Sequence, residues 1–241
     1  MKLSIVGLPI GNIEDISFRA IQTIQESKYL VCEDTRMFSN LWSKLQSLGY
    51  VQKYEGKIRF INDFNEERQL PRVVEEMMLE ENAVLVSDAG MPLISDPGYK
   101  LVRSAVEAGW EIDVIPGPTA ESAALALSGL PTDKYFFVGF LPKKEGKRTD
   151  MLKHLLEMSK LQKFTAVIYE SPQRTEKILN EIQKLLGESL GCCVAIDITK
   201  ISEKVYRGTV SSVLNELQGK KIKGEVVIVL GLQQESSDDQ I

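Results

Sequence analysis

Two short groups of charged residues have the composition that an active site needs. Glu33-Asp34-Thr35-Arg36 places three charged groups within four residues, directly after an apolar run. Asp197-Ile198-Thr199-Lys200 places a carboxylate and an ammonium at the end of another apolar run. Carboxylates and cations are the groups that acid–base and electrostatic catalysis use. A helix-capping acidic turn and a surface ion pair are the structural alternatives, and the sequence leaves both open.

The cysteines and the single histidine limit the chemistry available to the chain. Cys192 and Cys193 are adjacent and Cys32 is distant, so they form neither a disulfide framework nor a zinc-binding motif. Free cysteines more often serve as small buried apolar residues, and this is the role expected for all three. His154 falls in a segment with helical periodicity and is expected on a helix surface. The sequence therefore disfavours a metal site and acid–base chemistry by histidine.

Four loops rich in glycine and proline follow apolar runs, at residues 7–12, 87–98, 116–120 and 169–172. Ligands of open α/β sheets bind at such strand ends. The first loop has neither the dinucleotide-binding spacing nor the lysine of a phosphate-binding loop. The prolines of the second loop remove N–H groups, so it suits a shaped ligand such as an adenosyl group better than a phosphate. Turns often need these residue types, and only the joint occurrence of the four loops indicates a site.

A basic run, Lys143-Lys144-Glu145-Gly146-Lys147-Arg148, contrasts with the acidic balance of the chain. The whole sequence has 29 basic and 34 acidic residues, a formal net charge of −5. This balance argues against a general nucleic-acid coat protein, because phosphate binding needs clustered cations. The basic run, expected in a loop, is either a solvated surface loop or a local contact for nucleic acid.

Short apolar runs alternate with segments of helical period, which predicts an α/β fold. Strands are expected at residues 3–6, 29–32, 57–61, 83–86, 111–115, 135–139, 165–169, 193–198 and 226–230. Helices are expected at residues 16–25, 39–48, 65–81, 99–108, 120–128, 149–158, 174–186 and 210–217.

Pro116-Gly117-Pro118 is the expected domain boundary, because two prolines around a glycine interrupt regular structure. We expect an N-terminal lobe at 1–116, a C-terminal lobe at 117–233 and a polar tail at 234–241. The N-terminus resembles a strand rather than a secretory signal, and no apolar stretch approaches the roughly 18 residues of a membrane helix. These features predict a cytoplasmic protein.

In this order, the segments resemble the tetrapyrrole methylase superfamily, and within it the branch of ribosomal RNA small-subunit methyltransferase I. The longest matching run, Ser-Asp-Ala-Gly-Met-Pro-Leu-Ile-Ser-Asp-Pro-Gly-Tyr at residues 87–99, is highly specific. Further matches lie at residues 9–12, 33–36, 116–118, 128–133, 139–142, 169–172, 199–200, 207–208 and 223–225. The resemblance covers residues 3–231.

One segment departs from the family pattern. The family usually has a His-(Asp/Glu)-His-Asn-Glu run after the third strand, where this chain has Asn62-Asp63-Phe64-Asn65-Glu66. Both histidines are therefore replaced, which bears on substrate choice.

The resemblance implies two α/β lobes of the tetrapyrrole methylase type with the cofactor cleft between them. It also implies transfer of a methyl group from S-adenosyl-L-methionine to the ribose 2′-hydroxyl of a cytidine in small-subunit (16S) ribosomal RNA. The substrate would be that RNA or the assembled small subunit, and the protein would pair as a homodimer.

The resemblance also implies roles for particular residues. A base or a cation would assist the weakly acidic 2′-hydroxyl, and the candidates are Glu33, Asp34 and Lys200. The expected cofactor-binding residues are Pro9, Asp88, Ala89, Gly90, Ile94, Thr119, Ala120 and Tyr169. The expected RNA-binding residues are Arg36, Lys143, Lys144, Lys147 and Arg148.

Two other functions stay open. The first is a superfamily enzyme that methylates a tetrapyrrole or a protein residue. The second is a module that binds S-adenosylmethionine without catalysis, which the missing histidines make conceivable.

Overall fold

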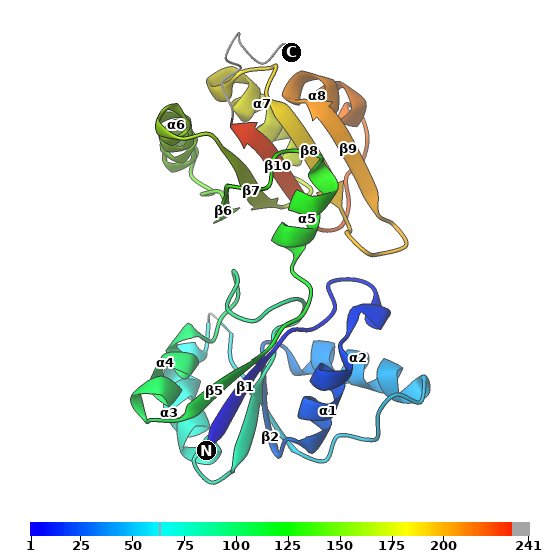
Figure 1. The fold of residues 1–241 in the computed structure, drawn as a ribbon, viewed down its shortest axis with the longest axis vertical. Coiled ribbons are helices and arrows are strands. Elements are labelled where there is room, and N and C mark those ends of the chain that lie inside the picture. The colour runs from blue at the N-terminus through cyan, green and yellow to red at the C-terminus, as the bar shows by residue number, and fades with distance from the viewer. Residues whose placement is uncertain (63, 233–241) are drawn as a thin grey trace. The chain divides into compact units, whose positions relative to one another are not determined.

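The computed structural model describes residues 1–62 and 64–232, and the chain divides into two compact units (Figure 1). The division lies between Thr119 and Ala120, three residues after the end of the expected N-terminal lobe at 116. The expected polar tail lies outside the described residues.

The first unit is built on one parallel sheet. Its strands are β1 (Lys2–Val6), β2 (Tyr29–Cys32), β3 (Lys57–Phe60), β4 (Asn82–Leu85) and β5 (Glu111–Ile115). Their order is β3-β2-β4-β1-β5, and every neighbouring pair is parallel. The carboxyl ends of all five described strands therefore lie at one edge of the sheet.

Helices cover both faces of this sheet (Figure 1). They are η1 (Ile13–Asp15), α1 (Phe18–Glu26), α2 (Thr35–Ser47), α3 (Glu66–Met77) and α4 (Tyr99–Glu107). Side chains of α1 and α2 pack on one face in a core with the strand residues Val6 and Val84. Those of α3 and α4 pack on the other face, in a core with Leu3 and Leu85. Successive strand residues thus enter different cores, as the two-residue period requires.

The second unit is built on a mixed sheet. Its strands are β6 (Tyr135–Phe140), β7 (Phe164–Glu170), β8 (Gly191–Ile196), β9 (Lys204–Thr209) and β10 (Val226–Leu232), in the order β6-β7-β10-β8-β9. The β6–β7 pair is parallel and the other pairs are antiparallel. Its helices are α5 (Ala120–Ser128), α6 (Glu145–Leu161), α7 (Thr175–Leu186) and α8 (Val210–Leu217).

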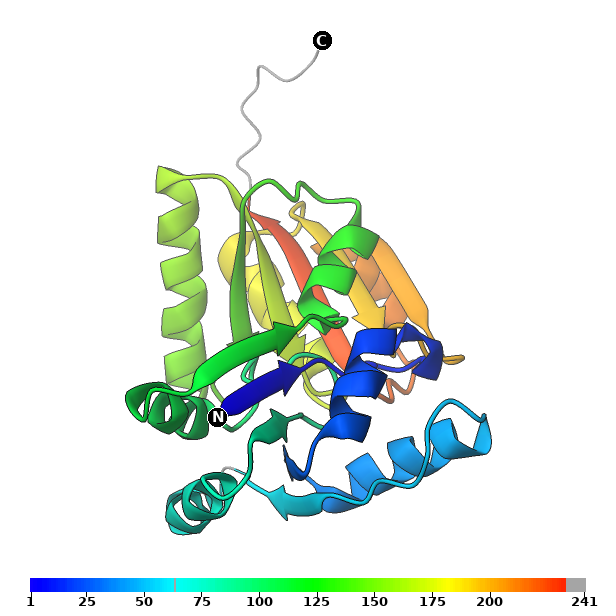
Figure 2. The ribbon, with the colours of Figure 1, turned by 60° about the horizontal axis from the view of Figure 1, so that its bottom comes forward.

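The two faces of the second sheet are also covered by helices. Figure 2 shows α5 lying across one face. The main core of the unit joins α6, α7 and α8 to Ile168, Val194 and Ile228 of the sheet, on the face away from α5. Within the described residues, no helix is both long and apolar enough to cross a membrane.

Two helix starts and one missed strand differ from the sequence-based predictions for identifiable physical reasons. Helix α2 begins at Thr35 rather than residue 39, because the Asp34 carboxylate caps it. Helix α6 begins at Glu145 rather than residue 149, so the loop expected at 145–148 was wrong; Gly146 is tolerated in the first helical turn. Strand β9 was missed because it is a half-exposed edge strand with charged residues, which resembles a loop.

A close backbone approach fixes the ends of β1 and β5. The Gly7 N–H donates to Ile115 O at 3.0 Å. A Cβ added to Gly7 would lie 2.7 Å from the amide N and the Cα of Gly117. Only glycine fits at these two positions without a shift of the backbone.

We expect Gly7→Ala to destabilise the first unit by about 1–3 kcal/mol, the usual cost of overpacking. Gly146→Ala is the matched control, because nothing lies within 4 Å of the added Cβ. It should leave the melting temperature unchanged or raise it slightly, since alanine favours the helix. Thermal unfolding of the two variants measures the difference, and equal melting temperatures would contradict the packing account.

Candidate functional site

Backbone hydrogen bonds join the loops that leave β1 and β4. Leu8 N–H donates to Gly90 O at 2.8 Å, and Gly90 N–H donates back to Leu8 O at 3.1 Å. Gly117 N–H, after β5, donates to the sulfur of Met91 at 3.3 Å. The loops that contain the expected cofactor-binding residues Pro9 and Gly90, both buried, are therefore joined in the first unit.

A pocket of about 410 Å³ lies at the same edge of the sheet. It is lined by Glu33, Asp34, Thr35, Arg36, Phe60, Asn62, Phe64 and Asp88. The structure thus brings together Glu33, Asp34, Arg36 and Asp88, which the sequence placed after two different strands. Sequence reasoning assigned no role to Phe60 or Thr35. Their only signal was their place at the end of β3 and beside Asp34.

Asp34 has a structural role as well as a place in the pocket. Its carboxylate accepts the backbone N–H of Arg36 at 2.8 Å and so caps α2. The Arg36 guanidinium also donates to it through Nε and through Nη2, the latter at 2.6 Å. These hydrogen bonds lower the pKa of Asp34 to about 2. Asp34 is therefore a fully ionised carboxylate that holds Arg36.

Asp88 connects the ends of β2 and β4. Its Oδ1 accepts the Asp34 N–H at 3.1 Å. Burial raises the pKa of Asp88, and the Asp34 charge raises it further. The buried Cys32 thiol nearby has a pKa of about 12, raised first by burial and then by Asp88. Cys32 is thus a protonated core residue, the role expected for it.

The loop at residues 87–98 is held in an unusual conformation. Ser87 Oγ donates to Ala89 O at 3.1 Å. Leu93 and Ser95 adopt left-handed backbone angles, with φ of 76° and 66°. Such angles cost about 1–3 kcal/mol each in non-glycine residues and occur often at ligand sites. Ile94, between them, is 40% exposed and available to a ligand.

In the second unit, Tyr169 is held by an acidic residue that sequence reasoning missed. Its hydroxyl donates to Glu121 Oε2 at 2.5 Å and accepts the Glu121 N–H at 3.2 Å. Phe137 and Phe140 contact the Tyr169 ring, with centroids 4.9 and 5.6 Å away. The Glu121 carboxylate is buried at the start of α5, next to Ala120. A sequence pattern of small residues gave no sign of this pair.

Lys200 belongs to a separate polar cluster of the second unit. Its Nζ lies 2.7 Å from Glu225 Oε2 and 3.2 Å from Asp197 Oδ1. Ser202 Oγ donates to the other Asp197 oxygen at 2.8 Å. Burial lowers the pKa of Lys200, but the two carboxylates outweigh this effect and keep it above its ordinary value. The surface ion pair that the sequence left open is therefore present, and Lys200 stays cationic.

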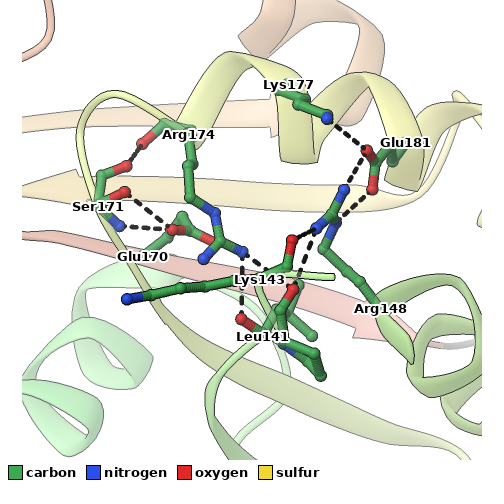
Figure 3. Close-up of polar contacts among 10 residues, drawn as sticks. Leu141, Lys143, Arg148, Glu170, Ser171, Arg174, Lys177 and Glu181 are labelled. Carbon is green, nitrogen blue, oxygen red and sulfur yellow. Dashed lines mark hydrogen bonds and ion pairs between the residues drawn. The ribbon is translucent and has the colours of Figure 1, made fainter. Parts of the chain in front are cut away.

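The basic run requires a correction at Arg148. Its side chain is 2% exposed and forms two hydrogen bonds with the Glu181 carboxylate, at 2.6 and 2.7 Å (Figure 3). Arg148 Nη1 also donates to the carbonyls of Pro142 and Lys143. The prediction that Arg148 contacts RNA was wrong for this conformation, because the guanidinium supports the start of α6 instead. The Lys143 side chain extends away from this cluster (Figure 3).

The other members of the basic run are exposed. Lys144 and Lys147 are both accessible at the first turn of α6, as is Lys143 just before it. The available cations of this segment are therefore three lysines rather than three lysines and an arginine. Among the described residues, no group of histidine, cysteine and acidic side chains could hold a metal ion.

The chain thus consists of two α/β units, with the motifs of the sequence in the loops that follow their strands. The family of Tetrapyrrole (Corrin/Porphyrin) Methylases matches residues 2–214, and the chain belongs to this family. The resemblance drawn from the motifs is thereby confirmed.

Curated relatives extend the match over nearly the whole chain. Ribosomal RNA small subunit methyltransferase I of Thermotoga maritima is 36% identical over 95% of this chain and 97% of its own length. The protein of the same name from Hydrogenobaculum sp. is 36% identical, over 95% of each chain. The one from Escherichia coli O157:H7 is also 36% identical, over 95% of this chain and 77% of its own.

Solved structures confirm the fold. The cobalamin biosynthetic enzyme cobalt precorrin-4 methyltransferase, CbiF, matches with a TM-score of 0.65 at 19% identity, over 97% of this chain and 96% of its own. Uroporphyrin III C-methyl transferase from Thermus thermophilus matches with a TM-score of 0.62 at 15% identity, over 95% and 96%. At these identities the likeness supports the two-sheet α/β architecture alone.

Arg36→Ala tests the electrostatics of the pocket. Without the guanidinium, the pKa of Asp34 should rise from about 2 toward the ordinary aspartate value of about 3.9. An NMR pH titration of the Asp34 carboxyl carbon measures the change. Arg103→Ala, which removes a cation paired with Glu107, is the control and should leave Asp34 unchanged. An unchanged pKa in Arg36→Ala would contradict the assigned contact.

Arg148→Ala and Lys147→Ala separate a structural arginine from an exposed lysine. Loss of Arg148 leaves Glu181 without its main partner, and we expect a loss of about 3 kcal/mol in the free energy of unfolding. Lys147→Ala should change stability by less than about 0.5 kcal/mol, as surface substitutions do. Denaturant unfolding measures both. An Arg148→Ala variant as stable as the wild-type chain would contradict the structural role assigned to Arg148.

Proposed function

We propose that this chain uses S-adenosyl-L-methionine to methylate the ribose 2′-hydroxyl of a cytidine in small-subunit (16S) ribosomal RNA. Family membership and the names of the curated relatives support the reaction class and the RNA. The observation that carries the proposal is the pocket at the edge of the first sheet. It gathers Glu33, Asp34, Arg36 and Asp88, which the sequence motifs had singled out.

The residues present fit the proposed methyl donor. Three carboxylates, Glu33, Asp34 and Asp88, line the pocket together with one guanidinium. An acidic lining favours a cationic sulfonium over an anionic ligand such as a nucleotide phosphate. When bound, S-adenosylmethionine supplies an already activated methyl group.

The remaining cofactor assignments stay predictions supported by the loops in each unit. In the first unit they are Pro9, Asp88, Ala89, Gly90, Ile94 and Thr119. In the second unit they are Ala120 and Tyr169, where the Glu121–Tyr169 pair fixes the ring. We propose Glu121 as a further supporting residue, because it orients Tyr169.

The lowered pKa of Asp34 leads us to assign different roles to the carboxylates of the pocket. With a pKa of about 2, Asp34 is a weak proton acceptor at neutral pH. We therefore assign Asp34 to the orientation of Arg36, and the acceptance of the 2′-hydroxyl proton to Glu33 or Asp88. The cationic Lys200 keeps its proposed role in stabilising negative charge.

The proposed RNA contacts are Arg36 and the exposed lysines Lys143, Lys144 and Lys147. Exposed cations bind phosphates without reading sequence and position the RNA. The assembled subunit as substrate, pairing as a homodimer and a cytoplasmic location stay predictions.

The assay that tests the proposal supplies purified small ribosomal subunits and radiolabelled S-adenosylmethionine, and maps the methylated nucleotide. We expect label at a cytidine ribose, and a fall in kcat of about a hundredfold or more for Glu33→Gln or Asp88→Asn, the scale of a lost general base. Of Glu33→Gln and Asp88→Asn, the variant that removes the proton acceptor should lose the most activity, and Asp34→Asn should retain more activity than that variant. A porphyrinogen offered in a parallel reaction tests the competing substrate class.

Three results would contradict this proposal. Label on the porphyrinogen would indicate a tetrapyrrole enzyme, and label on a ribosomal protein would indicate a protein methyltransferase. Calorimetric binding of S-adenosylmethionine without transfer to any of these substrates would indicate the non-catalytic module.

A further inference from the structure

The pocket of the first unit contains an aromatic side chain in an unusual position. Phe64 is 99% exposed, although a phenylalanine ring gains free energy when it leaves water. It lines the pocket together with Phe60, the last residue of β3, which is 44% exposed.

The backbone that presents Phe64 is held by two asparagines. Asn62 Oδ1 accepts the N–H groups of Phe64 and Asn65, each at 3.2 Å. Asn65 Oδ1 in turn accepts the Asn62 N–H at 2.9 Å. Asn65 is itself buried and precedes α3. The exposed ring is therefore attached to a hydrogen-bonded turn anchored on a helix.

The remaining lining of the pocket indicates which ligand this ring meets. Six of the eight lining residues are polar or charged, which does not suit an apolar protein segment. Carboxylates in general can accept a hydrogen bond from the exocyclic amino group of cytosine, and three carboxylates line this pocket. An aromatic face stacks on any base, and Arg36, whose side chain is 86% exposed, can contact an adjacent phosphate.

We propose that Phe64, supported by Phe60, is the surface on which the target cytosine stacks while its ribose enters the pocket. This inference rests on the proposed function and adds the residue that holds the base. The phenylalanine side chain has no hydrogen-bonding group, so its ring contributes stacking and apolar contact alone. Substrate binding in this chain therefore depends on the aromatic face.

The test compares Phe64→Ala, Phe64→Leu and Phe64→Trp with the wild-type chain. Phe64→Ala and Phe64→Leu should lower kcat/KM for purified small subunits at least about fivefold, while Phe64→Trp stays within about twofold of wild type, because tryptophan also stacks. Affinity for S-adenosylmethionine, measured by calorimetry, should not change in any variant. Phe18→Ala is the matched control, since Phe18 is 90% exposed but does not line the pocket.

A second readout does not depend on methyl transfer. In a fluorescence titration, an RNA oligonucleotide with a fluorescent cytosine analogue should bind the wild-type chain and Phe64→Trp with similar affinity, and Phe64→Ala at least about fivefold more weakly. Unchanged kcat/KM in Phe64→Ala would overturn the stacking role while leaving the proposed function intact. If the wild-type chain methylates no RNA, the proposed function fails. Equal affinity of wild type and Phe64→Ala for the oligonucleotide would then overturn the stacking role as well.

Discussion

The parallel pairing of the first sheet is the constraint on which the site depends. β1 pairs in parallel with β4 and β5, and β2 pairs in parallel with β3 and β4. Residues far apart in the sequence, such as Glu33, Asn62 and Asp88, therefore leave the sheet at one edge. Reversal of β2 or β4 would move Glu33 or Asp88 to the opposite edge. Two loop-to-loop contacts, Leu8 with Gly90 and Asp34 with Asp88, then fix the spacing. A site held by backbone groups in this way is organised before any ligand arrives.

The sequence predicted best those helices and strands that are determined by their own pattern of apolar and polar residues. Strands β2 and β5 and helices α5 and α8 have the expected bounds, because apolar runs and small-residue helices carry strong periodicity. The elements predicted less well depend on tertiary partners. Strand β9 is stabilised by its pairing with β8, and its own sequence is too polar to indicate a strand.

The site was predictable in part for the same reason. The motifs indicated Glu33, Asp34 and Asp88, because charged residues after apolar runs are visible in one dimension. The motifs did not reveal that Arg148 would be buried, because its partner Glu181 lies 33 positions further along, on α7. Glu121 was missed for a related reason, since its partner Tyr169 lies 48 positions further along the chain, on β7. Long-range polar pairs leave no local pattern, so only a three-dimensional structure separates a structural cation from an exposed one.

Charge explains how an acidic pocket could serve an RNA substrate. The three carboxylates of the pocket outnumber its single guanidinium, so a formal excess of two negative charges repels phosphates. The RNA backbone must then stay outside, where exposed cations such as Arg36 can hold it. The ribose and base are uncharged and can enter, which requires the nucleotide to leave its stack, at a cost of a few kcal/mol. Phe64 can recover part of this cost by stacking on the displaced base. In this proposal the acidic lining and the exposed aromatic ring act together. The lining keeps the phosphate backbone out of the pocket, and stacking on Phe64 offsets part of the free energy of unstacking the base.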